Sequence, residues 1–241
     1  EIGLRMNPNG RESGDASQRD SAVPLTAPSP NPCDDIVQAL AEVGWCVTDG
    51  FLPQTLVAAL RREALALHRA GDFHRAGIGR GRDLQICPEV RGDEVLWLDP
   101  SSRSEAQRGL LDRIEALRLA LNRALFLGLF EFEGHLAVYP PGSFYRRHLD
   151  RFQGVEARTV TCVIYLNDAW SEADGGQLRL YADPADADAG TDILPLGGRL
   201  VTFLSADYPH EVLPARRERV SVTGWLKRRS GGGRPGAPAG V

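Results

Sequence analysis

His148, Asp150 and His210 are the residues of this 241-residue chain whose types and spacing indicate the most specific chemistry. Side chains two positions apart on a β-strand point to the same face, so His148 and Asp150 would direct an imidazole and a carboxylate toward one point. A second strand would bring His210 to them. Two histidines and one carboxylate on one face of an octahedron leave the opposite face open, as in non-haem iron(II) oxygenases. The three residues therefore predict an iron(II) site for oxidation chemistry.

Arg219 favours this interpretation over a simpler one, in which Asp150 only hydrogen-bonds a solvated histidine. It lies nine residues after His210 and begins an alternating segment, residues 219–226, which is typical of a strand with one inward face. A buried arginine needs an anion, and its guanidinium matches a carboxylate through two parallel hydrogen bonds. The distal carboxylate of 2-oxoglutarate is the anion that an iron(II) site of this kind predicts.

Composition excludes several other classes of protein. Hydrophobic residues make up 42% of the chain, and the formal net charge of −4 gives no argument for nucleic-acid binding. No apolar run approaches the roughly 18 residues that a membrane-spanning helix needs. The N-terminal residues show no secretory h-region, so no signal peptide is expected, and there is no CxxC pair among the cysteines, which are Cys33, Cys46, Cys87 and Cys162. We therefore expect a soluble cytoplasmic protein with reduced thiols and without nucleic-acid or membrane partners.

The chain divides into four segments by its residue pattern. Residues 1–32 are polar and proline-rich and are expected to be a disordered tail, and residues 230–241 are expected to be a flexible tail. Residues 33–130 are predicted to form a support region of helices and strands. In residues 131–229 the pattern changes to short alternating strands separated by glycine and proline turns, as in a jelly roll. The predicted fold is α+β, a double-stranded β-helix (jelly roll) braced by N-terminal helices.

Three helices are expected in the support region. The first is capped by Asp34 or Asp35, the second opens at Pro53, and the third follows a capping box of Ser102 and Glu105. Their apolar residues recur at helical spacing, so each helix should bury one face in the core.

A series of short segments in a fixed order forms a longer signature. They are Gly44 to Leu52, Arg91 to Trp97, Tyr139-Pro140, Tyr145 to Asp150, Thr161 to Asn167, Gly175 to Tyr181, Pro209 to Val212 and Arg219 to Trp225. In this series the chain resembles the iron(II)- and 2-oxoglutarate-dependent prolyl hydroxylases, over roughly residues 44 to 228. Within that family it is similar to the branch with the hypoxia-inducible-factor prolyl hydroxylases and their bacterial relatives. The resemblance implies a jelly-roll dioxygenase.

The resemblance also implies roles for individual residues. The positions that match the metal and cosubstrate sites are His148, Asp150 and His210 for iron, Arg219 and Tyr165 for the distal carboxylate of 2-oxoglutarate, and Tyr139 and Thr223 for the pocket wall. The positions that match the substrate entrance are Arg158, Asp93, Trp97 and Trp225. For the entrance residues, a salt bridge and packed aromatic rings are an equally good explanation.

Residues 71–91 are rich in glycine and arginine and lack the Lys-Ser/Thr pair of a phosphate-binding loop. The resemblance implies a mobile loop that closes over a bound peptide, and a solvated connector is the alternative. The remaining histidines, His68, His74 and His135, are expected to be solvated or capping residues without a ligand role.

The sequence therefore predicts an iron(II)- and 2-oxoglutarate-dependent dioxygenase, similar to peptidyl-proline 4-dioxygenases, that hydroxylates a prolyl residue in a protein. Dioxygen would be consumed, succinate and CO2 released, and ascorbate would serve as reductant. Resemblance to the bacterial members implies elongation factor Tu as a candidate partner. Two alternatives stay open: a hydroxylase of a free amino acid or small metabolite, and a non-catalytic metal-binding sensor module.

Overall fold

Two antiparallel β-sheets and three α-helices form the described part of the computed structural model, which covers residues 32–78, 85–102, 104–150, 157–183 and 189–229. The predicted tails, at residues 1–31 and 230–241, lie outside this part. So does the centre of the glycine-rich loop, residues 79–84.

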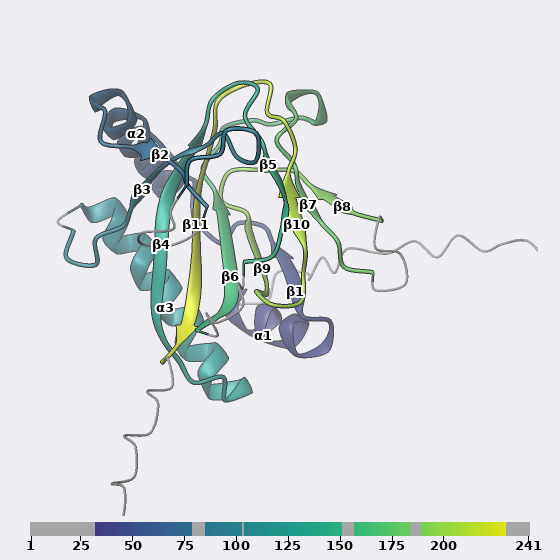
Figure 1. Ribbon diagram of the computed structural model, residues 1–241. Coiled ribbons are helices and arrows are strands. Elements are labelled where there is room, and N and C mark those ends of the chain that lie inside the picture. The colour runs from purple at the N-terminus through teal and green to yellow at the C-terminus, as the bar shows by residue number, and fades with distance from the viewer. Residues whose placement is uncertain (1–31, 79–84, 103, 151–156, 184–188, 230–241) are drawn as a thin grey trace, which may run out of the picture.

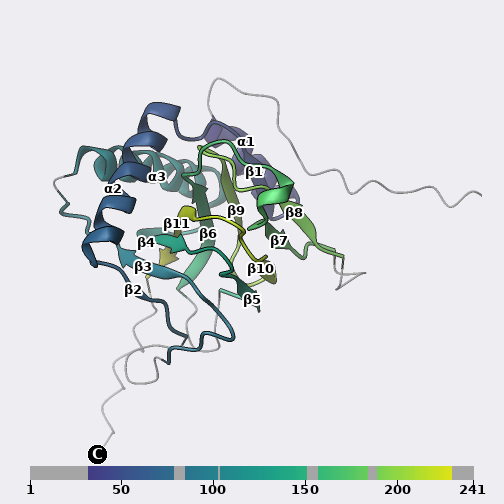
Figure 2. The same cartoon turned by 90° about the horizontal axis from the view of Figure 1, so that it is seen from above.

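The two sheets face each other, with the helices on the outer side of the larger sheet (Figures 1 and 2). The larger sheet has the strand order β1 (Trp45–Thr48), β9 (Leu200–Leu204), β6 (Arg158–Tyr165), β11 (Arg219–Arg228), β4 (Leu129–Tyr139), β3 (Glu94–Trp97), β2 (His74–Arg75). The smaller sheet has the order β5 (Tyr145–His148), β10 (His210–Val212), β7 (Leu178–Leu180), β8 (Thr191–Ile193). This arrangement confirms the predicted jelly roll with bracing helices.

The helices are α1 (Pro32–Glu42), α2 (Gln54–Ala70) and α3 (Glu105–Leu125), and a 3-10 turn, η2 (Glu172–Asp174), precedes β7. The predicted capping box at the start of α3 is wrong. The N-cap is Ser104, whose hydroxyl oxygen accepts from the Gln107 N–H at 3.2 Å. The same hydroxyl donates to Glu63 of α2 at 2.5 Å, so this cap also joins two helices.

Strand alternation divides the hydrophobic residues between two cores. On β6, Val160, Cys162 and Ile164 pack against the helices, whereas Val163 and Tyr165 face the smaller sheet. Successive side chains of a strand point to opposite faces, so β6 is apolar on both sides because both sides are covered. The second core, between the sheets, contains the cavity described below.

None of the four cysteines, all of which lie in the described part of the chain, is in a disulfide. Among the helices that the structure describes, none has both the length and the apolar character to span a bilayer.

Candidate active site

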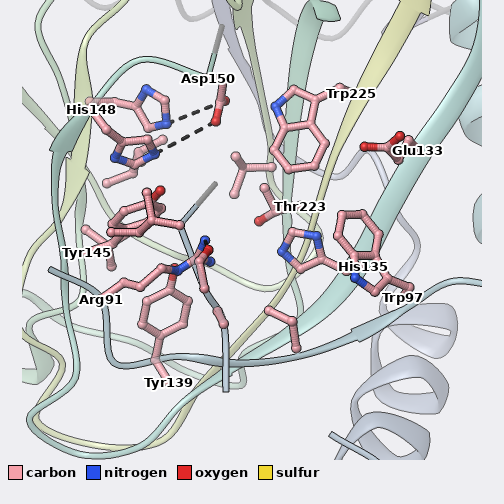
Figure 3. A pocket seen from close by; sticks show the side chains of 18 of the residues that line it. Arg91, Trp97, Glu133, His135, Tyr139, Tyr145, His148, Asp150, Thr223 and Trp225 are labelled. Atoms are coloured by element: carbon pink, nitrogen blue, oxygen red, sulfur yellow. Dashed lines mark hydrogen bonds and ion pairs between the residues drawn. The ribbon is translucent and has the colours of Figure 1, made fainter. Parts of the chain in front are cut away.

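A cavity of about 470 Å³ lies between the two sheets, a size common for small-molecule sites. Strands β3, β4 and β11 line one wall, and residues of β5 and β10 line the opposite wall. Figure 3 shows His148 on one side of this space and His135 with Trp97 on the other.

The three predicted metal ligands meet at the wall formed by β5 and β10. These strands pair so that His210 lies directly opposite His148, and Asp150 follows two residues after His148. Nε2 of His148 is 3.8 Å from Asp150 Oδ1, and Nε2 of His210 is 3.6 Å from Asp150 Oδ2. The three candidate ligand atoms lie within 4.8 Å of one another, which is close enough for one ion.

Neighbouring groups orient these side chains. The Arg146 carbonyl oxygen lies 2.7 Å from Nδ1 of His148, and the Tyr208 carbonyl oxygen lies 3.0 Å from Nδ1 of His210. A carbonyl only accepts, so Nδ1 carries the proton in each ring and Nε2 keeps a lone pair for a metal. The Thr161 hydroxyl donates to Asp150 Oδ2 at 2.8 Å, which fixes the carboxylate.

The electrostatics of the three residues also match a metal site. Burial, followed by the effect of His210, lowers the pKa of His148 to about 3, so this imidazole is neutral at physiological pH. Burial acts to raise the pKa of Asp150, but His210, His148 and the Thr161 hydrogen bond together hold it below its usual value. Neutral imidazole and ionised carboxylate are the forms that bind iron(II).

Arg219 and Tyr165 place unused hydrogen-bond donors deep between the sheets. Arg219 is 1% exposed, and it donates from Nε to the Gly176 carbonyl at 2.9 Å and from Nη1 to the Ser221 hydroxyl at 3.3 Å. Its Nη2 and the Tyr165 hydroxyl are buried without any hydrogen-bond partner. Burial raises the pKa of Tyr165 to about 12, although Arg219 acts in the opposite direction, so the phenol keeps its proton.

No acidic side chain in the described part of the chain pairs with Arg219. Burying an unpaired cation is costly, so this pocket fits an anion that is supplied from outside. The guanidinium carbon lies 4.8 Å from the ring centre of Tyr139 and 5.1 Å from that of Tyr165. Thr223 lies on the same face of β11 and lines the cavity, so the residues present fit 2-oxoglutarate.

Gly176 shapes the anion pocket. It has φ +69°, a conformation that residues with a Cβ rarely adopt, and its carbonyl accepts the Arg219 Nε hydrogen bond. A Cβ at this position would lie 3.1 Å from Arg219 Cδ. Gly176 therefore helps to hold the guanidinium in place.

Three of the four predicted entrance residues line the cavity, and the fourth does not. Trp97 is 47% exposed at the cavity, and Trp225 is buried beside it, with ring centres 6.4 Å apart. Arg158 stacks on Trp225 at 3.4 Å and pairs with Glu133 at 3.1 Å. Asp93 is not among the lining residues of the cavity.

Asp93 forms a buried ion pair with Arg91, at 2.8 Å from Nε and 2.6 Å from Nη2. Arg91 lines the cavity and lies 4.2 Å above the ring of Tyr145. Tyr145 in turn stacks on His148, with ring centres 3.6 Å apart. No role was assigned to Arg91 or Tyr145 from the sequence, although both lie within the segments that carry the family resemblance.

The expectation that His135 is solvated or capping is wrong. It is 4% exposed and lines the cavity, because position 135 shares a face of β4 with Ala137 and Tyr139. The resemblance implied a pocket position for Tyr139, and because position 135 is four residues earlier on the same strand, alternation could have placed His135 on that face.

The glycine-rich loop lies beside the cavity in its described portions. His74, Gly77 and Ile78 are lining residues, and Ile78 forms a bridge with Gln85. Closure of this loop over a substrate stays a prediction.

Comparisons with known proteins agree with this site. Residues 134–227 match the family model of the 2OG-Fe(II) oxygenase superfamily. The chain is 32% identical to prolyl hydroxylase EGLN3 of Mus musculus over 198 residues, which cover 79% of this chain and 81% of that protein.

Solved structures show the same relationship. A prolyl-4-hydroxylase of Pseudomonas putida matches with a TM-score of 0.74 and 44% identity, covering 82% of this chain and 100% of that one. A Trichoplax adhaerens prolyl hydroxylase, in complex with a hypoxia-inducible-factor oxygen degradation domain peptide, matches with a TM-score of 0.72 and 29% identity, covering 81% and 88%. The chain therefore belongs to the iron(II)- and 2-oxoglutarate-dependent oxygenases of the prolyl hydroxylase type.

Proposed function

We propose that this protein hydroxylates a prolyl residue within a protein substrate and converts 2-oxoglutarate to succinate and CO2. The observation that carries the proposal is the pairing of two features between the same two sheets. One is the ligand set of His148, Asp150 and His210, and the other is the pair of unpartnered donors on Arg219 and Tyr165. The named activities of the EGLN3 and Pseudomonas putida relatives support proline as the target.

Iron(II), when bound with 2-oxoglutarate and dioxygen, supplies the oxidation that replaces a C–H bond by C–OH. The side chains of this protein contribute binding, orientation and electrostatics. Arg219 and Tyr165 would hold the far carboxylate of 2-oxoglutarate, and Thr161 fixes the Asp150 carboxylate that would bind the metal. No side chain is needed as a general base, because the reaction requires no deprotonation of the substrate by the protein.

Trp97 favours a polypeptide over a small metabolite. It is a large apolar side chain that is 47% exposed where it lines the cavity. Exposed tryptophans beside a pocket are typical anchors for a polypeptide partner. A free amino acid fits within the cavity and would not need an exposed tryptophan beside it for binding.

The direct test incubates the protein with iron(II), 2-oxoglutarate, ascorbate and recombinant elongation factor Tu, followed by peptide mass spectrometry. Elongation factor Tu is our first candidate because of the resemblance to bacterial members, ascorbate is the proposed reductant, and the cytoplasm is the proposed location. We expect one added oxygen on a proline. Asp150→Ala is the inactive control, and Arg217→Ala, which changes an exposed side chain, is the active one.

The same assay separates the alternatives. A cell lysate replaces elongation factor Tu in a second arm, and free L-proline replaces it in a third. Hydroxylation of free proline without any modified protein would move the enzyme to the small-metabolite class. Absence of succinate in every arm would instead support the metal-binding sensor module.

A further inference from the structure

His135 is a buried polar residue of the cavity that the proposed chemistry does not use. Its ring contacts two indoles that also contact each other, with centres 4.9 Å from Trp97 and 5.7 Å from Trp225 (Figure 3). Nδ1 is buried without a hydrogen-bond partner, and neither ring nitrogen takes part in a hydrogen bond or ion pair. An unpaired buried polar group is costly, so its retention in the cavity wall points to a ligand.

The register of the larger sheet holds this ring firmly. Trp97 on β3 lies opposite His135 on β4, and Thr223 on β11 lies opposite it on the other side. All three line the cavity. His135 therefore lies in the middle of a three-strand surface.

The imidazole is neutral in this environment. Burial, together with the nearby Arg91 guanidinium, lowers the pKa of His135 to about 4. Above that pH the ring has one N–H donor and one acceptor nitrogen. It is therefore suited to an uncharged polar group.

We propose that His135 is a substrate-binding residue that donates a hydrogen bond to a carbonyl oxygen of a peptide group next to the target proline. This inference rests on the proposed function. Proline has no backbone N–H, so the peptide group that precedes it presents only an acceptor to the enzyme. The N–H of His135 supplies the matching donor, while Trp97 and Trp225 offer apolar surface to the pyrrolidine ring. The site thus distinguishes a peptide-bonded proline from a free amino acid, which carries charged groups at these positions.

Two substitutions separate the hydrogen bond from the packing. His135→Phe keeps an aromatic ring against both indoles and removes both nitrogens, whereas His135→Gln keeps a donor. The probe is a synthetic peptide around whichever proline the wild-type enzyme hydroxylates in the assay above. Loss of a neutral hydrogen bond should raise the peptide KM of the Phe variant about three- to tenfold, and Gln should restore part of the loss. The KM for 2-oxoglutarate should not change in either variant.

A modified peptide tests the acceptor directly. Replacing the carbonyl oxygen before or after the proline by sulfur weakens that acceptor. For one of these two thioamide peptides, the wild-type KM should rise while the KM of His135→Phe should not rise further, because the interaction is already lost. Additive effects of variant and both thioamides would overturn the proposal.

The remaining outcomes are also decisive. If the His135→Phe variant has the same KM for the peptide as the wild-type enzyme, the inference is overturned and the proposed function stays intact. Equal rises in the KM for peptide and for 2-oxoglutarate show a structural role and overturn it as well. If the wild-type enzyme modifies no peptide or protein, the proposed function fails and this inference fails with it.

Discussion

Replacing Arg219 by Met should weaken 2-oxoglutarate binding about 10- to 150-fold. Met keeps much of the apolar stem, but it removes the charged donor whose Nη2 has no partner in the protein. A hydrogen bond to a charged group contributes about 1.5 to 3 kcal/mol, and about 1.4 kcal/mol corresponds to a factor of ten in affinity. Arg219→Lys should be intermediate, because an ammonium cannot present two parallel donors.

Thermal unfolding with iron(II) under nitrogen measures this loss without turnover. At a 2-oxoglutarate concentration of about 100 times the wild-type Kd, binding should stabilise the wild-type protein by about 2.7 kcal/mol, and a variant that binds about 100-fold more weakly by about 0.4 kcal/mol. For a chain of this size these values correspond to shifts in Tm of about 5 to 10 °C and about 1 °C. Arg217→Met is the matched control, because Arg217 is exposed and pairs with Asp174. Equal 2-oxoglutarate-induced shifts in Arg219→Met and wild type would refute the assignment of Arg219.

Three further predictions concern the metal site and the cavity wall. His210→Ala should abolish turnover and most iron(II) binding while circular dichroism stays unchanged, and wild-type iron(II) affinity in this variant would contradict the ligand assignment. Thr161→Val should weaken iron(II) binding about 10- to 100-fold in a chelator competition, because it removes the hydrogen bond to the metal-binding carboxylate. Arg91→Ala should lower the free energy of unfolding in urea by about 3 to 5 kcal/mol, because Asp93 is left buried without a partner. Arg179→Ala, which breaks an exposed pair, should lower it by less than about 1 kcal/mol, and similar losses in the two variants would argue against a special cost at Arg91.

Strand alternation made much of the fold and of the site predictable. The period of two is a local property, so it gave the inward face of β11 and placed Arg219 on it before any pairing was known. The spacing of His148 and Asp150 was informative as well, although β5 ends at His148 and Asp150 lies just beyond the strand. The partner strand of His210 was not determined by spacing, because it depends on how β5 and β10 pair.

Features that depend on distant partners were missed. Ser104, and not Ser102, caps α3. The Ser104 hydroxyl also donates to Glu63 of α2, and this contact spans 41 positions of the chain. His135 was given a solvated position because its burial requires Trp97 and Trp225 on neighbouring strands. Local patterns predict which way a residue points, whereas its surroundings come from tertiary pairing.

The two faces of β11 allow the enzyme to vary its chemistry and its stability separately. Val220, Val222 and Leu226 belong to the core beneath the helices, while Thr223 and Trp225 line the cavity. A point substitution on one face can therefore alter selectivity with little effect on the helix-packed core, and the reverse also holds. Inserting one residue would exchange the faces and destroy both functions at once. The length of β11 is therefore strongly constrained, whereas changes of residue type at Thr223 or Trp225 on its cavity side would act on the pocket and not on the helix-packed core.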